Sequence, residues 1–113
     1  MSVNRRRGEV AAELDGQGFR LCLTLGALAE LEAAYEADDL GALIERFAGG
    51  RLSARDLIRI VGAGLRGGGN PVSDEEVARM QAADGVAGFA KIVSDLLAAT
   101  FGAKQPAEMS QNP

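Results

Sequence analysis

Apolar and polar residues alternate over residues 8–24, in two stretches separated by DGQG at residues 15–18. Alternation with a period of two is typical of a β-strand with one buried face, and glycines in a short connection are typical of a tight turn. The pattern therefore predicts a β-hairpin over 8–24. Its inward face is expected to carry the apolar residues Val10, Ala12, Leu14, Phe19, Leu21 and Leu23.

Two registers of this hairpin are compatible with the pattern. In the first, Leu14 lies opposite Phe19, and Glu13 lies opposite Arg20 on the solvent side, where opposite charges favour pairing. In the second, the turn moves to residues 15–16, which shifts the pairs but keeps the same residues on the inward face. The inward face is therefore predicted independently of the register.

At residue 25 the pattern changes from alternation to helical spacing. Leu25, Leu28, Leu31 and Tyr35 recur every three or four residues, which is typical of one face of an α-helix. An isolated hairpin is only marginally stable in water, so this helix, expected over about 25–37, is predicted to pack against it. The same four residues are the candidate partner-binding surface, provided that the hairpin does not cover their whole face.

Four further helices are predicted from helical spacing and from signals at their starts and ends. Ser53 followed by Asp56, and Ser73 followed by Glu76, have the spacing of a capping box, in which each side chain bonds the backbone of the other residue. Acidic residues at 38–39 suit the start of another helix. The expected ranges are 39–48, 53–66, 73–83 and 86–101.

Together these elements predict an α+β fold, mostly α, in which an N-terminal β-hairpin packs on a cluster of about five short helices. A chain of 113 residues has room for one domain, which is expected over 8–102. Residues 1–7, with three arginines, are expected to form a flexible basic N-terminus. Gly102 suits the end of the last helix, and residues 103–113, with two prolines and little to bury, are expected to form a disordered tail.

Composition narrows the class of protein. Apolar residues make up 47% of the chain and aromatic residues only 4%, so the core is expected to be aliphatic. The 16 acidic and 12 basic residues give a net charge of −4, which argues against a general binder of nucleic acid or acidic membranes.

Cys22 is the only cysteine, so neither an intrachain disulfide nor a cysteine cluster for zinc is expected. The apolar runs are too short to span a bilayer, and no signal-peptide segment follows the N-terminal arginines, so a cytoplasmic protein is expected.

The residues needed for common catalytic chemistry are missing. The chain has no histidine, which excludes a Ser–His or Cys–His nucleophile within it. Residues 62–67 spell GxGxxG, but they fall in a predicted helix, whereas the dinucleotide-binding motif needs a strand followed by a helix. The acidic clusters at 38–39 and 74–76 lie at predicted helix starts, where carboxylates stabilise the helix dipole without a metal. We therefore expect no enzyme activity, cofactor, metal site or small-molecule substrate.

Two features indicate protein–protein interaction instead. The predicted hairpin leaves at least one strand edge unpaired, and such an edge favours strand addition from another chain. Several short Leu/Ala-rich helices with few bulky aromatic residues leave room for a groove that takes a partner helix. Most apolar residues on these helices are nevertheless expected to belong to the core.

Seven short motifs follow one another between residues 7 and 102: RGEV (7–10), LGALAELE (25–32), DDL (38–40), RLSARDL (51–57), AGLRG (63–67), VSDEEV (72–77) and LLAATFG (96–102). Taken in this order, they resemble the gene transfer agent family of small tail proteins. The resemblance covers nearly the whole predicted domain. Family members are encoded among the tail genes of bacterial gene transfer agents and siphovirus-like prophages, which implies a role in building a long, non-contractile tail.

The family is described both as a tail tube protein and as a tail assembly chaperone. As a chaperone, the protein would bind the tape-measure protein, a very long helical chain, and keep it soluble until tube subunits polymerise around it. The predicted helices favour this version, because a tube subunit is expected to be mostly β-sheet. The alternative is a minor structural component of the tail or tail tube that is retained in the particle.

The resemblance also implies the partners. They are the tape-measure protein and, second, the tail tube protein, and the chain leaves room for a homo-oligomer. Nucleic acid and membrane are not expected as partners, since the net charge argues against DNA binding through residues 5–7. The family motifs identify no catalytic residues. The protein is expected in the bacterial cytoplasm, associated with tail particles if it is retained in them.

Overall fold

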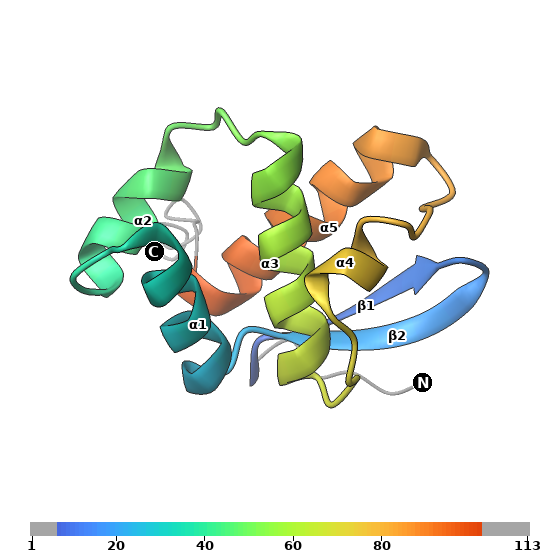
Figure 1. Ribbon diagram of the computed structural model, residues 1–113, viewed down its shortest axis with the longest axis horizontal. Helices are drawn as coiled ribbons and strands as arrows, with labels where there is room; N and C mark the ends of the chain where they lie inside the picture. The colour runs from blue at the N-terminus through green and yellow to red at the C-terminus, as the bar shows by residue number, and fades with distance from the viewer. Residues whose placement is uncertain (1–6, 103–113) are drawn as a thin grey trace, which may run out of the picture.

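The computed structural model describes residues 7–102, which form a β-hairpin followed by five helices (Figure 1). This architecture confirms the α+β class, mostly α, that the sequence predicts. The expectations of a flexible N-terminus over 1–7 and of a disordered tail over 103–113 fall almost entirely outside the described residues.

The hairpin consists of β1 (Glu9–Leu14) and β2 (Gln17–Cys22), which pair antiparallel around a two-residue turn. The turn residues Asp15 and Gly16 both have positive φ, 53° and 75°. A two-residue turn of type I′ requires positive φ at both positions, and Asp followed by Gly is among the sequences that adopt it most readily. The local sequence therefore sets the turn.

Of the two predicted registers, the one with its turn at residues 15–16 is confirmed. Ala12 lies opposite Phe19, and Glu13 lies opposite Gly18. The predicted cross-strand pair of Glu13 with Arg20 is wrong, because it depends on the other register. The inward face is as predicted: its buried residues are Val10, Leu14, Leu21 and Leu23, and Ala12 and Phe19 pack against the core from its margin.

The helices are α1 (Leu25–Tyr35), α2 (Leu40–Ala48), α3 (Ala54–Gly67), α4 (Asp74–Val77) and α5 (Gly85–Phe101). Both predicted capping boxes are present: Ser53 and Asp56 bond each other's backbone at the start of α3, and Ser73 and Glu76 do so at the start of α4. Gly102 has φ 74° and ends α5 in the left-handed conformation, as expected of its residue type.

α4 is much shorter than the helix predicted over 73–83. After Val77 the chain leaves the helix and meets the hairpin turn, where the backbone N–H of Asp15 donates to the carbonyl of Gln81 at 2.8 Å. The backbone N–H of Gln81 in turn donates to Oδ1 of Asp15 at 2.9 Å. The predicted range is wrong at its C-terminal end, because contacts with a turn more than sixty positions away replace the helical hydrogen bonds.

α3 occupies the centre of the molecule, with α1 and α2 on one side of it, α4 and the hairpin on the other, and α5 crossing behind (Figure 1). It packs against β2, α1 and α5. The core that these contacts enclose is aliphatic, as the composition predicts. Its largest fully buried side chains include Leu14, Leu21, Leu31, Leu43, Ile60, Leu65 and Leu96.

Glycines allow the close approach of α3 to β2. A Cβ atom at Gly67 would overlap the carbonyl oxygen of Cys22, and one at Gly68 would overlap the carbonyl oxygen of Arg20. A Cβ atom at Gly64 would lie 2.9 Å from Cδ1 of Leu96. The GxGxxG sequence thus lies within α3 and serves packing, because only glycine leaves space for a strand backbone at this distance.

Candidate partner-binding site

The four residues that the sequence predicts as a partner-binding face do not share one exposed surface. Leu28 and Leu31 are 6% and 2% exposed and belong to the core, so they are closed to a partner in this conformation. Leu25, at the start of α1, is 80% exposed. Tyr35 is half-buried at the other end of α1. A partner contact at Leu25 and Tyr35 stays a prediction, whereas Leu28 and Leu31 stabilise the fold.

Tyr35 takes part in a network around the one buried carboxylate among the described residues. Its hydroxyl donates to Oδ1 of Asp56 at 2.5 Å, and the backbone N–H of Ser53 donates to Oδ2 at 2.8 Å. The guanidinium of Arg46 lies 3.3 Å from Oδ1 and forms an ion pair with it. Asp56 is 3% exposed, and its acceptor atoms are occupied from α1, from α2 and from the start of α3.

The pKa values of the two acids reflect this environment. Burial and then the hydrogen bond to Asp56 raise the pKa of Tyr35 to about 12. Burial would by itself raise the pKa of Asp56, but the hydrogen bonds from Tyr35 and Ser53 and the charge of Arg46 outweigh it, so the pKa is lowered. At neutral pH the network therefore contains a neutral tyrosine and an ionised aspartate.

Two guanidinium groups lie against the ring of Tyr35. The Cζ atom of Arg46 lies 4.9 Å from the ring centroid and that of Arg59 lies 5.1 Å from it, both within the range of a cation–π contact. The ring of Phe47 meets Tyr35 edge to face, with centroids 5.3 Å apart. These contacts join α1, α2 and α3, and they fix the direction of the Arg59 side chain.

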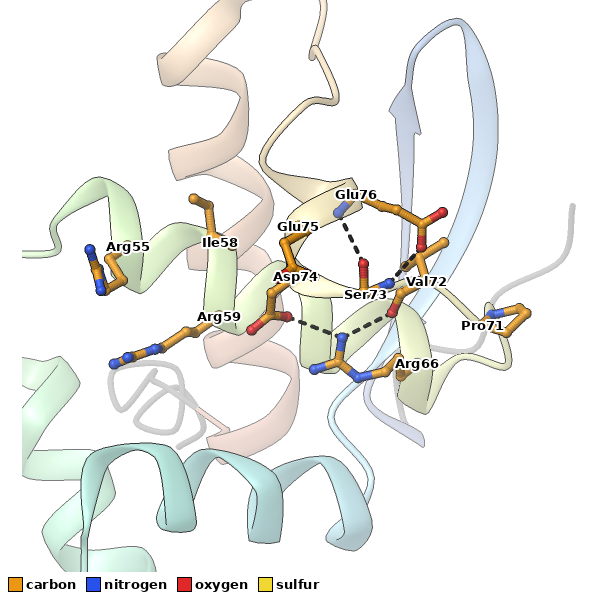
Figure 2. A pocket seen from close by; sticks show the side chains of 10 residues that line it. All are labelled: Arg55, Ile58, Arg59, Arg66, Pro71, Val72, Ser73, Asp74, Glu75 and Glu76. Atoms are coloured by element: carbon orange, nitrogen blue, oxygen red, sulfur yellow. Dashed lines mark hydrogen bonds and ion pairs between the residues drawn. The ribbon is translucent and has the colours of Figure 1, made fainter.

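Beyond Arg59, the outer face of α3 borders an open pocket of about 820 Å³, which reaches to residues 71–76 (Figure 2). On one side of it, Arg66 is fully engaged: it bonds Glu30 at 2.7 Å, Asp74 at 3.1 Å and the carbonyl of Val72 at 3.0 Å. The hydrogen bond to Glu30, more than any other contact, raises the pKa of Arg66. This side of the pocket is a closed ionic network.

The other side of the pocket carries arginines that are not paired in this way. Figure 2 shows Arg55 and Arg59 extending from α3 in the same direction, away from Arg66, with Ile58 on the same stretch of helix. Neither guanidinium forms an ion pair with a carboxylate of residues 7–102. These two arginines were not among the site residues predicted from the sequence. Their spacing of one helical turn was the available signal, but ordinary solvated helices show the same spacing.

A second opening lies between α2 and α5. It has a volume of about 590 Å³ and almost entirely apolar walls, which we call the α2–α5 groove. Ile44 and Phe47 line it from α2, and Leu97 and Phe101 line it from α5. The sequence predicts a groove among the short helices but does not indicate which helices border it.

The hairpin offers less open strand edge than the sequence suggests. On the outer side of β2, Nδ2 of Asn70 donates to the carbonyl of Arg20 at 2.8 Å. On the outer side of β1, the turn bonds Gln81, and Leu14 forms a β-bridge with Ala82. Strand addition is therefore restricted at these positions, which makes the helical surfaces the better candidates for a partner.

Within residues 7–102, no group of three or more Cys, Asp or Glu side chains is arranged to hold a metal ion. No helix in the same range has both the length and the apolar character needed to cross a membrane.

The family model described as "Phage tail tube protein, GTA-gp10" matches residues 7–103, which include every strand and helix described above. No curated protein and no solved structure is significantly similar to the chain.

Proposed function

The chain belongs to the phage tail tube protein, GTA-gp10, family, and from this membership we propose that it is a non-enzymatic component of a phage-like tail that is retained in the finished particle. The observation that carries the proposal is the extent of the match, which spans residues 7–103. A match of this extent supports a role of the whole fold rather than of one shared motif.

The fold favours a minor component attached to the tube over a subunit that forms the tube wall. A wall that closes through strand pairing needs many strands from each subunit, whereas residues 7–102 contain a single two-stranded sheet. The outer edges of this sheet are partly covered by residues 70 and 81–82. Attachment would therefore use helical surfaces, for which the α2–α5 groove and the pocket beside Arg55 and Arg59 on α3 are candidates.

The test is the protein composition of purified tail particles. A retained component is expected at a constant ratio to the tube subunit after gradient purification, measured by quantitative mass spectrometry. Absence from intact, purified particles that contain the tube subunit would contradict the proposal. An unrelated cytoplasmic protein of similar abundance serves as the control for contamination.

A tail assembly chaperone is the second candidate function, and the α2–α5 groove favours it. Apolar side chains line this opening, and Ile44 remains 40% exposed. Such a surface suits transient burial of apolar helical segments, as in a tape-measure protein before tube assembly. A chaperone would act in the bacterial cytoplasm and be missing from the finished particle.

Co-expression with the tape-measure protein tests this candidate. The expected result is a larger soluble fraction of the tape-measure protein and copurification of the two chains, both lost with Ile44→Glu. The matched control is Val86→Glu, which introduces the same charge at another exposed apolar residue, outside the groove. Equal solubility with and without the protein would exclude the chaperone function and leave the particle component.

A further inference from the structure

The stretch of chain that runs from the end of α2 into α3 is positive on a molecule that is negative overall. Residues 45–59 contain four arginines and two carboxylates, whereas the whole chain has a net charge of −4. One of the two carboxylates, Asp56, points into the fold and is 3% exposed. The exposed face of α3 is therefore more positive than its sequence composition suggests.

Asp56 does not neutralise the arginines on that face. Its oxygens are occupied by Tyr35, by Ser53 and by the ion pair with Arg46. Arg59 instead rests on the ring of Tyr35, 5.1 Å from the centroid. An arginine side chain has five N–H donors, more than its contacts with one tyrosine can use, so Arg59 keeps donors for a planar acceptor such as a carboxylate.

Arg55 lies one helical turn before Arg59, in the first turn of α3. The positive end of the helix dipole lies there, and a cation at this position is unfavourable for the isolated helix. No carboxylate of residues 7–102 forms an ion pair with Arg55 to offset this. A bound carboxylate would gain from both the arginine and the helix dipole.

The residues that line the pocket restrict the class of ligand that can bind there. Ile58 and Val72 give it an apolar part, and carboxylates at residues 74–76 line its far side. Those carboxylates would repel a polyanion that spans the whole pocket, such as a nucleic acid. A ligand with a few carboxylates on the α2 side and an apolar group toward Ile58 avoids this repulsion.

From these contacts we infer that Arg55 and Arg59 bind carboxylates of an acidic, amphipathic helix in a partner protein, with Ile58 contacting an apolar side chain of that helix. Two guanidinium groups one helical turn apart match two Glu side chains at i and i+4 of a partner helix. The inference rests on the proposed function only in placing the partner among the tail proteins.

The test uses a fluorescein-labelled peptide of about 18 residues, long enough to be helical, with Glu pairs at i and i+4 and a Leu stripe beside them. Fluorescence anisotropy with the full-length protein is expected to show saturable binding that weakens as salt rises. Arg55→Glu is expected to weaken binding about tenfold or more, because it replaces an attractive contact by a repulsive one. A peptide with Gln in place of every Glu is expected not to bind.

The matched control is Arg79→Glu, which makes the same charge change at an exposed arginine outside the pocket. It is expected to change binding by less than about twofold. Equal weakening by both variants would overturn the inference, since it would show a response to net charge alone. No binding of the Glu peptide would overturn it too, as would binding of a DNA duplex that Arg55→Glu abolishes. The particle composition is measured separately, so failure of the peptide assay and failure of the proposed function are distinguishable.

Discussion

The hydroxyl of Tyr35 donates a 2.5 Å hydrogen bond to Oδ1 of Asp56, which joins the end of α1 to the start of α3. The same carboxylate accepts a hydrogen bond from the backbone N–H of Ser53. The side chain of Asp56 therefore both caps α3 and holds the end of α1 against it. Because the guanidinium of Arg59 lies over the ring of Tyr35, this bond also helps to position an arginine on the proposed binding face.

Replacing Tyr35 by Phe tests the energetic role of this bond. The variant keeps the ring that contacts Arg46 and Arg59 but removes the donor, so a buried acceptor loses a partner. We expect the free energy of unfolding to fall by about 1–3 kcal/mol. Urea denaturation followed by circular dichroism measures it, and a loss below about 0.3 kcal/mol would contradict the assignment.

Asp56 is expected to contribute to loss of stability in acid. Its pKa is lower in the folded protein than in the unfolded chain. At a pH near these two pKa values, the unfolded chain therefore binds more protons than the folded protein. The contribution is present in full above the unfolded pKa of about 3.9 and is lost as pH falls through the folded pKa. Urea midpoints below about pH 4 should therefore fall more steeply for the wild type than for Asp56→Asn. Parallel curves would exclude Asp56 as a source of the acid sensitivity.

Tyr35 gives a second expectation at high pH. Its pKa is raised to about 12, above an unfolded value of about 10, so the folded protein holds the proton more tightly. The stability that this provides is complete below about pH 10 and is lost as pH rises toward 12. Tyr35→Phe should show a smaller loss of stability over that interval than the wild type, measured as urea midpoints at each pH. An equal loss would show that other groups cause the alkaline transition.

A substitution at Gly67 tests the close approach of α3 to β2. Alanine is favoured over glycine within a helix by about 1 kcal/mol, but a Cβ atom here overlaps the backbone carbonyl of Cys22, which cannot rotate away. Overpacking of this kind costs about 1–3 kcal/mol, so Gly67→Ala is expected to be destabilising on balance. Gly49→Ala is the control, because no atom lies within 4 Å of its added Cβ and its φ is −67°. Thermal melts that rank the two variants in the opposite order would contradict the packing argument.

Substitutions at Leu28 and Leu25 compare a core position with a surface position on the same helix, α1. Leu28→Asp places a charge in the core and is expected to cost more than about 4 kcal/mol, enough to unfold a marginally stable domain. Leu25→Asp changes an 80% exposed position and is expected to shift stability by less than about 0.5 kcal/mol. Circular dichroism decides between these outcomes. A folded Leu28→Asp protein would show that this face is not part of the core.

Predictions from the sequence succeed where the interacting groups are close in the chain. The capping boxes of Ser53 with Asp56 and of Ser73 with Glu76 span three residues each, and the turn at residues 15–16 depends on its own two residues. The inward face of the hairpin follows from alternation alone. The ordered motifs over residues 7–102 also indicated the tail protein family that the family match then showed.

Other features arise from contacts between distant segments. The end of α4 depends on Gln81 meeting Asp15, and the burial of Asp56 depends on Tyr35, which is 21 residues away. The capping pattern identified Asp56 as a local helix start, but its role in joining three helices was not visible in that pattern. Helical spacing alone does not separate core from surface, because it is the same in both cases. It therefore could not show that Leu28 and Leu31, predicted on a partner-binding face, are buried.

The sequence by itself thus determined the class of fold, the helix starts and the family, because caps, turns and hydrophobic periodicity are local and each involves only a few neighbouring residues. The tertiary structure alone decided which apolar face is core, that an apolar groove lies between α2 and α5, and which arginines of α3 form no ion pair within residues 7–102. The reason is physical: burial and charge neutralisation are properties of the space around a side chain, and that space is filled by residues from other parts of the chain.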